Sequence, residues 1–115
     1  MASDVIGAAR HVLNELRPGL DEKLYENALV IELKERGYRI EQQRSFPVNY
    51  RGIRIGSLVP DLIVEEKAIT DAKVVSAFTS HHIAQMLGYL NVMELEVALL
   101  LNFKEAKLRW KPVVL

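Results

Sequence analysis

The chain has 115 residues, of which 50% are hydrophobic and 26% are charged, and we expect one folded domain over residues 1–115. It has no cysteine, which excludes disulfides and thiolate zinc sites, and no apolar run or leader typical of membrane insertion, so we expect a cytoplasmic protein with no membrane partner. The net charge of zero argues against a simple basic nucleic-acid-binding module, but acidic residues around a metal can offset a basic rim.

Two helices are expected at the start of the chain. Apolar residues recur at helical spacing from Ser3 to Leu16, and Pro18–Gly19 ends this segment. Asp21 is a suitable N-cap for a second helix, and Gly37 is a suitable stop signal. The expected apolar side of the second helix includes Leu24, Ala28, Leu29 and Leu33.

The middle of the chain predicts β-strands. Alternating residues from Arg44 to Tyr50, a turn at Arg51–Gly52 and a short strand at Ile53–Ile55 indicate a hairpin. Two further β-rich runs, Leu58–Val64 and Ala68–Val75, are separated by three charged residues, which indicates a second hairpin with a tight connection.

The last part of the chain predicts a helix over Phe78–Met93 and strands within Leu95–Phe103 and Leu108–Leu115. The expected order is two helices, four strands, a helix and two strands. A helix between the second hairpin and the buried run Val97–Leu101 indicates an α/β fold whose mixed β-sheet is covered on both faces. The unpaired edge of the last strand invites a homodimer.

Two aspartates are expected to face each other in the second hairpin. A three-residue connection pairs Val64 with Ala68 and places Asp61 directly opposite Asp71. Like charges in that position destabilise a strand pair, so something must neutralise them. Lys73 is one candidate, because it lies two residues beyond Asp71 on the same face of the strand.

A divalent cation is the other candidate. Two carboxylates, the backbone carbonyl of Ala72 and several waters are the oxygen ligands that Mg²⁺ prefers, with Mn²⁺ as a substitute. Such an ion can polarise a phosphoryl oxygen and acidify water, while Lys73 orients the nucleophile or stabilises negative charge. This chemistry is phosphodiester hydrolysis. The alternative is an exposed strand face with an ordinary surface contact between Asp71 and Lys73.

Three motifs resemble those of known nucleases. Pro60–Asp61 followed by Asp71–Lys73 resembles the signature of the PD-(D/E)xK nuclease superfamily. Gln85–Tyr89 resembles the QxxxY motif of bacterial recombination helicase-nucleases. Gly19–Tyr25 is similar to GxxExxY, the motif that names a small family of prokaryotic proteins in this superfamily, and that resemblance extends over nearly the whole chain. One departure is Asp71, where that family more often has glutamate.

The resemblance implies a restriction-endonuclease-like α/β/α core around one metal site. It implies carboxylate and carbonyl ligands, a catalytic lysine, and polar helix residues that support catalysis and contact substrate: Glu22, Asp61, Asp71, Ala72, Lys73, Gln85 and Tyr89. The implied function is a Mg²⁺- or Mn²⁺-dependent nuclease acting on DNA, or on RNA. The alternative is a non-catalytic domain of the same fold that binds a protein or nucleic-acid partner.

Other polar residues have two interpretations each. Glu26 lies one turn beyond Glu22 and is a substitute for it as the third acid, whereas His81 and His82 are expected to be surface histidines. A group of arginines either contacts a phosphate backbone or keeps a strand edge soluble: Arg36, Arg39, Arg44, Arg51 and Arg54. The large aromatic residues are expected in the core: Tyr25, Tyr38, Phe46, Phe78 and Trp110.

Overall fold

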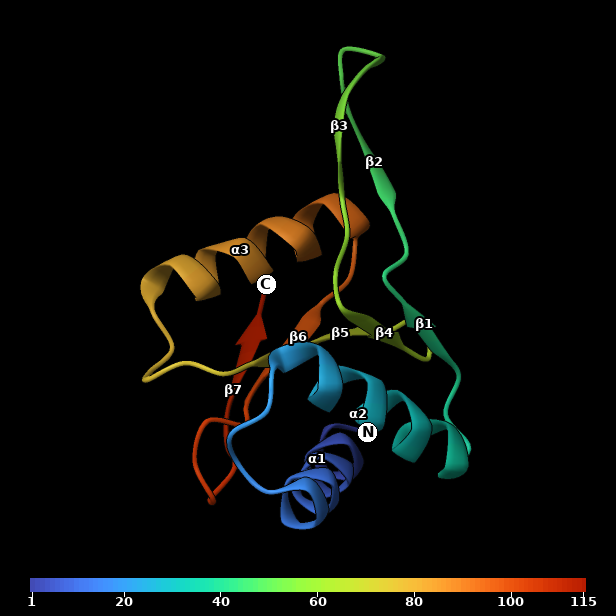
Figure 1. Ribbon diagram of the computed structural model, residues 1–115. Coiled ribbons are helices and arrows are strands. Elements are labelled where there is room, and N and C mark those ends of the chain that lie inside the picture. The colour runs from blue at the N-terminus through green and yellow to red at the C-terminus, as the bar shows by residue number, and fades with distance from the viewer.

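A computed structural model describes the whole chain, from Met1 to Leu115 (Figure 1). Its elements are α1 (Ala2–Leu16), α2 (Glu22–Glu35), β1 (Ile40–Gln42), β2 (Phe46–Tyr50), β3 (Ile53–Leu58), β4 (Leu62–Val64), β5 (Ala68–Lys73), α3 (Ser80–Met93), β6 (Val97–Asn102) and β7 (Arg109–Val114). None of the three helices combines the length and the apolar composition needed to cross a lipid bilayer.

Five strands form a mixed sheet in the order β1-β4-β5-β6-β7. The central pair β5 and β6 is parallel, and α3 makes the crossover between them, as parallel pairing requires. All other neighbours are antiparallel. Helices α1 and α2 cover one face and α3 covers the other (Figure 1). This confirms the predicted α/β fold with a mixed sheet between helices.

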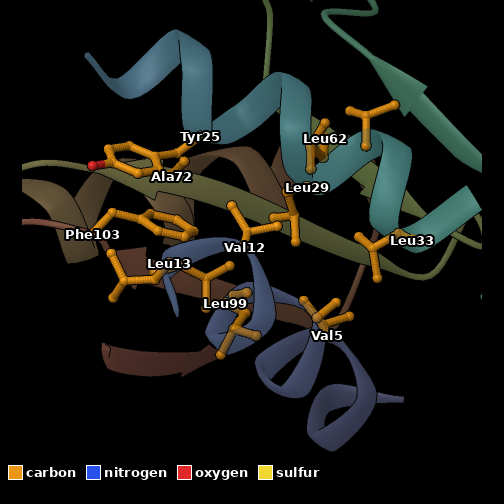
Figure 2. Packing of buried hydrophobic residues seen from close by; sticks show 14 of the residues in the cluster. Val5, Val12, Leu13, Tyr25, Leu29, Leu33, Leu62, Ala72, Leu99 and Phe103 are labelled. Carbon is orange, nitrogen blue, oxygen red and sulfur yellow. The ribbon is translucent and has the colours of Figure 1, made fainter. Parts of the chain in front are cut away.

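The larger core lies between the sheet and the helices α1 and α2 (Figure 2). It includes the stacked pair Tyr25 and Phe103 at one end, whose ring centroids are 4.8 Å apart and whose planes differ by 9°. Both side chains are fully buried, and truncating either ring would cost about 3–5 kcal/mol of stability. A smaller core beneath α3 contains Ile69, Met86 and Leu100.

The alternation of side chains along β5 determines what each face carries. Thr70 and Ala72 point toward α1 and α2, with Ala72 in the larger core. Ile69 packs under α3, so Asp71 and Lys73, two and four residues further on, also lie on the α3 face. The acidic residue and the lysine therefore share the face that α3 only partly covers.

Strand β1 was missed by the sequence analysis. It has only three residues, and it forms because Ile40 pairs with Val64 and Gln42 with Leu62 along the free side of β4. The predicted strand Leu58–Val64 was also wrong, because it is split between β3 and β4. Pro60 lies in the gap, where its ring and missing N–H are incompatible with a continuous ladder.

Two expected core residues lie at the surface instead. Leu24 is 50% exposed, because α2 turns Tyr25, Leu29 and Leu33 toward the sheet. Trp110 is 38% exposed, and the Arg10 guanidinium lies 4.8 Å from its ring centroid.

The free edge of β7 is interrupted by a proline. The N–H of Leu115 donates to the carbonyl of Glu96, so by alternation Trp110, Pro112 and Val114 direct their backbone groups away from β6. Pro112 has no N–H, so this edge lacks one of the donors that a pairing strand would use.

Strands β2 and β3 pair only with each other and form a separate hairpin, called here the arm (Phe46–Leu58). It extends away from the body of the molecule (Figure 1), and the whole chain, arm included, has principal dimensions of 47 × 31 × 22 Å. The arm leaves the sheet after Gln43, which has a left-handed φ of 55°, and returns at Pro60.

Candidate metal centre

The predicted register of β4 and β5 is confirmed: Val64 pairs with Ala68 and Leu62 with Thr70. Just beyond the last pair, the backbone N–H of Asp61 donates to Oδ1 of Asp71 at 3.1 Å. The structure thus brings the two aspartates together.

The carboxylate of Asp61 is held in return by the strand beside it. Its Oδ2 accepts a hydrogen bond from the backbone N–H of Ala72 at 3.2 Å. Asp71 is only 4% exposed. The two side chains therefore have a fixed geometry at the end of the β4–β5 hairpin, with neither carboxylate free to swing into solvent.

Lys73 lies next to this pair. Its Nζ is 3.8 Å from Oδ2 of Asp71, and its side chain is 18% exposed. This distance is at the outer limit of an ion pair, so the ammonium only partly neutralises the carboxylates. It remains close enough to act on a group bound beside them.

Helix α2 contributes two more acids, Glu22 and Glu26, which approach the ends of β5 and β1. Oε1 of Glu22 accepts the backbone N–H of Val74 at 3.0 Å, which places this carboxylate directly after Lys73. Glu26 is 4% exposed, and its Oε2 accepts hydrogen bonds from Lys23 at 3.1 Å, Gln42 at 2.7 Å and Gln43 at 3.0 Å.

Gln43 connects α2 to the aspartates, and the sequence analysis missed it. Its Nε2 donates to Glu26 and lies 3.4 Å from Oδ1 of Asp61. Glu26, which the sequence predicted as a substitute for Glu22, is buried, whereas Glu22 is exposed. A glutamine pair at the end of a three-residue strand carries no sequence signal of its own, because its position depends on the pairing of β1 with β4.

Burial and mutual repulsion shift the acids toward their neutral forms. Burial raises the pKa of Asp61 to about 7, the negative charges of Asp71 and Glu26 act in the same direction, and the Ala72 N–H and Lys73 oppose them. The pKa of Asp71 is also raised, mainly by burial, with additional repulsion from Glu26 and Glu22. The centre therefore concentrates more negative charge than its single lysine balances.

Helix α3 brings Gln85 and Tyr89 toward the same charges. Nε2 of Gln85 donates to the Tyr89 hydroxyl at 3.3 Å. The pKa of Tyr89 is raised by burial and by the negative charges of Asp71 and Asp61, so the phenol keeps its proton and can donate it in a hydrogen bond.

His82 has a structural role at the start of α3. Its Nδ1 accepts the backbone N–H of Thr79 at 3.1 Å, and the Thr79 hydroxyl accepts the N–H of His82 at 3.3 Å. This reciprocal pair is a capping box, which fixes where α3 begins and hence where Gln85 and Tyr89 lie.

The register of the β4–β5 hairpin offers no N–H to the backbone carbonyl of Ala72. The carbonyl of Lys73 accepts the Phe103 N–H on the β6 side, so the N–H and C=O of Ala72 point the opposite way, toward β4. Extending the register would pair Ala72 with Pro60, which has no N–H. Ala72 is 1% exposed, and an unpaired carbonyl there calls for a ligand.

These groups fit a hard divalent cation held by few protein ligands. No three Asp, Glu, His or Cys residues are arranged to hold a metal ion by themselves. The fitting donors are the carboxylates of Asp61 and Asp71 and the carbonyl of Ala72, on a site that needs positive charge. Mg²⁺ is commonly bound through one or two carboxylates and keeps several waters.

A mixed sheet between helices, with acids at the end of its central hairpin, defines a restriction-endonuclease-like fold. In agreement, the family profile of the PD-(D/E)XK nuclease superfamily matches residues 1–113. The chain belongs to the PD-(D/E)XK nuclease superfamily. Comparison with curated proteins and with solved structures gave no match.

Proposed function

We propose that residues 1–115 form one metal-dependent nuclease domain that hydrolyses phosphodiester bonds in DNA, or in RNA. The observation that carries the proposal is the contact between Asp61 and Asp71, next to a carbonyl of Ala72 to which the register offers no N–H. Two carboxylates held this close by hydrogen bonds to each other's strand repel each other, unless a cation lies between them or they take up protons. Membership of a nuclease superfamily makes a catalytic cation the better explanation.

Asp61, Asp71 and Ala72 would hold Mg²⁺ or Mn²⁺, and Glu22 has a second carboxylate oxygen that is not used by Val74. The bound ion would supply Lewis acidity to a phosphoryl oxygen and lower the pKa of water. Lys73 would stabilise the negative charge that develops on the phosphate as the nucleophile adds.

Gln85 and Tyr89 would act on the substrate. Both can donate hydrogen bonds from α3 toward the α3 face of β5, where Asp71 and Lys73 lie. Donors on this side would orient the non-bridging oxygens of the scissile phosphate and keep the nucleophile in line. The role of α3 is then positioning, while the charges act from β5.

The resemblance to the GxxExxY family gains support from what the motif residues do. Gly19 has φ of 111°, a conformation that favours glycine, and Glu22 reaches the end of β5. The buried hydroxyl of Tyr25 donates to the Arg17 carbonyl at 2.6 Å and accepts the Leu20 N–H at 3.2 Å. Glycine and tyrosine thus fix the loop that presents the glutamate.

The test compares metal binding with cleavage. Calorimetric titration of Mg²⁺ and Mn²⁺ should show binding to the wild type that Asp61→Asn and Asp71→Asn abolish. Lys73→Ala should keep metal binding and the folded circular dichroism spectrum but lose at least about a hundredfold of the cleavage rate. The matched control is Lys67→Ala, at the exposed far end of the same hairpin, which should cleave normally. Equal cleavage by all variants would identify a contaminating nuclease.

A second candidate is a non-catalytic domain of this fold that binds a protein or nucleic acid. It is favoured by the lack of a preformed cluster of three metal-binding side chains. It predicts no binding at millimolar metal and a more stable protein on Asp71→Asn, with partner binding unchanged. Homodimerisation through Leu108–Leu115 stays a prediction, and Pro112 weakens its basis by removing a donor from that edge.

A further inference from the structure

The arm is the most exposed regular element of the molecule. Tyr50, Ile53 and Ile55 are 58%, 70% and 67% exposed, and β2 and β3 pair only with each other. A two-stranded hairpin without a packed face is only marginally stable in water. Its side chains are therefore available to something outside the chain.

The charge of the arm is one-sided. The arm and the residues that connect it to the sheet, residues 43–60 together, contain three arginines and no acidic residue, in a chain whose net charge is zero. Arg44 is neutralised at the base by Glu41, at 2.7 Å. Arg51 and Arg54, near the tip, have no carboxylate partner, so the outer part of the arm complements a polyanion.

The base of the arm is part of the candidate metal centre. On one side, Gln43 contacts both Glu26 and Asp61. On the other, β3 leads through Pro60 directly into Asp61. A phosphodiester bound at the centre would therefore belong to a polymer that lies within reach of the arm.

We propose that the arm grips the backbone of a nucleic-acid duplex whose scissile phosphate lies at the metal centre. This inference rests on the proposed function and names its substrate as double-stranded. Strands of five and six residues reach roughly 17–20 Å, about half a helical turn of a duplex, and a two-stranded ribbon fits the major groove.

A duplex fits the arm better than a single strand does. Single-strand binding relies on aromatic rings on which unpaired bases stack. Tyr50 is the exposed ring on the arm, and the Arg51 guanidinium covers it at 5.1 Å from the ring centroid. Arg51 and Arg54 can instead contact phosphates, and Ile53 and Ile55 the apolar surface of the sugars.

The experiment measures binding without cleavage, in EDTA, with short fluorescent DNA and RNA duplexes and the matching single strands. The test variant is the double substitution Arg51→Gln with Arg54→Gln. The matched control, Lys34→Gln with Lys104→Gln, removes the same charge from exposed positions outside the arm. We expect duplex affinity to fall about tenfold in the arm variant, with the salt slope reduced by about two, and to change less than twofold in the control.

Four results would overturn the inference. Equal losses in both variants would mean that only total charge matters. Tighter binding of single strands, or no binding of any duplex by the wild type, would exclude a duplex as the substrate. Metal titration would still test the roles of Asp61 and Asp71 separately. A dimer in sedimentation that Ile53→Glu dissociates would show that the arm binds a second copy. Conversely, duplex binding through the arm without any cleavage would support the arm as a duplex-binding element but would refute the nuclease and the placement of a scissile phosphate.

Discussion

The backbone of Asp61 donates a hydrogen bond to the side chain of Asp71, at 3.1 Å, across the end of the β4–β5 hairpin. This hydrogen bond fixes the carboxylate of Asp71 in place. It also holds the carboxylate of Asp61 close to that of Asp71, so that two negative charges lie side by side. The centre is thus well ordered and electrostatically unfavourable when it holds only protein atoms. The first two predictions follow from this pairing and its surroundings.

The stability of the metal-free protein should fall as pH rises through neutrality. The pKa of Asp61 is raised from its ordinary 3.8 to about 7, so the folded state binds a proton more tightly than the unfolded state does. The stabilisation is complete below about pH 4 and is lost as pH rises toward and through 7. Urea unfolding in EDTA at pH 5 and pH 8 measures the effect, and Asp61→Asn should reduce it. A stability that rises over this range would contradict the assignment.

Pro60→Ala should weaken metal binding while leaving the fold intact. Alanine restores an N–H at the position that the register places opposite the carbonyl of Ala72. A hydrogen bond there would compete with the metal for the carbonyl oxygen, and we expect affinity to fall by roughly tenfold. Calorimetric titration of Mn²⁺ measures it, and Pro47→Ala in the arm is the control. Unchanged affinity would exclude the carbonyl as a ligand.

Tyr25→Phe should destabilise the protein by about 1–3 kcal/mol, because the carbonyl of Arg17 and the N–H of Leu20 lose the tyrosine hydroxyl that they share. The stacking on Phe103 is retained, so the core itself should not change. Chemical denaturation gives the stability. Metal affinity of the folded variant should also fall if the loop positions Glu22, and an unchanged affinity would remove that glutamate from the centre.

Thr70→Val should be neutral or stabilising, by up to about 2 kcal/mol. The Thr70 hydroxyl oxygen is buried and has no hydrogen-bond partner, and valine has nearly the same shape. Thr70→Ser is the informative comparison, because it keeps the hydroxyl and deletes the methyl group, and it should be less stable than the wild type. If valine destabilises the protein, the hydroxyl has a partner such as a buried water.

Glu66→Gly should stabilise the protein by about 0.5–1 kcal/mol, because Glu66 has a left-handed φ of 56° that costs a side-chain-bearing residue energy. Glu65 has a similar φ of 54°, but it also accepts hydrogen bonds from the backbone and the guanidinium of Arg39. Glu65→Gly should therefore stabilise the protein less than Glu66→Gly does, because it also removes these hydrogen bonds. Thermal unfolding of both variants gives the comparison, and a larger gain at Glu65 would contradict it.

Local patterns predicted the parts of the fold that depend on local contacts. The three-residue connection was enough to give the register from Val64–Ala68 to Leu62–Thr70, because a hairpin's register follows from its loop length. Strand β1 could not be predicted in the same way. Ile40–Gln42 has no alternation of its own and becomes a strand only because β4 offers a free edge.

The same division applies to the candidate centre. Asp61 and Asp71 are neighbours through the hairpin register, and Asp71 and Lys73 through the strand period, so their proximity could be predicted. The burial of Glu26 could not be predicted, because it depends on Gln42 and Gln43, which reach it from a different element. The prediction that Leu24 lies on the buried side of α2 was wrong for a related reason. The spacing of apolar residues allowed several faces of α2 to be buried, and the packing of Tyr25 on Phe103 selected one of them.

The crowding at the β4–β5 hairpin also bears on the order of folding. A hairpin with a three-residue connection ordinarily closes early, because it orders few residues before its contacts form. This one must bring Asp61 against Asp71 and place Glu65 and Glu66 in left-handed conformations as it closes. Early closure of the hairpin is therefore unfavourable. The stabilisation from strand pairing exceeds this cost only when β1 pairs with β4 and β6 pairs with β5. The chain should complete its centre late, and a divalent cation present from the start should speed that last step.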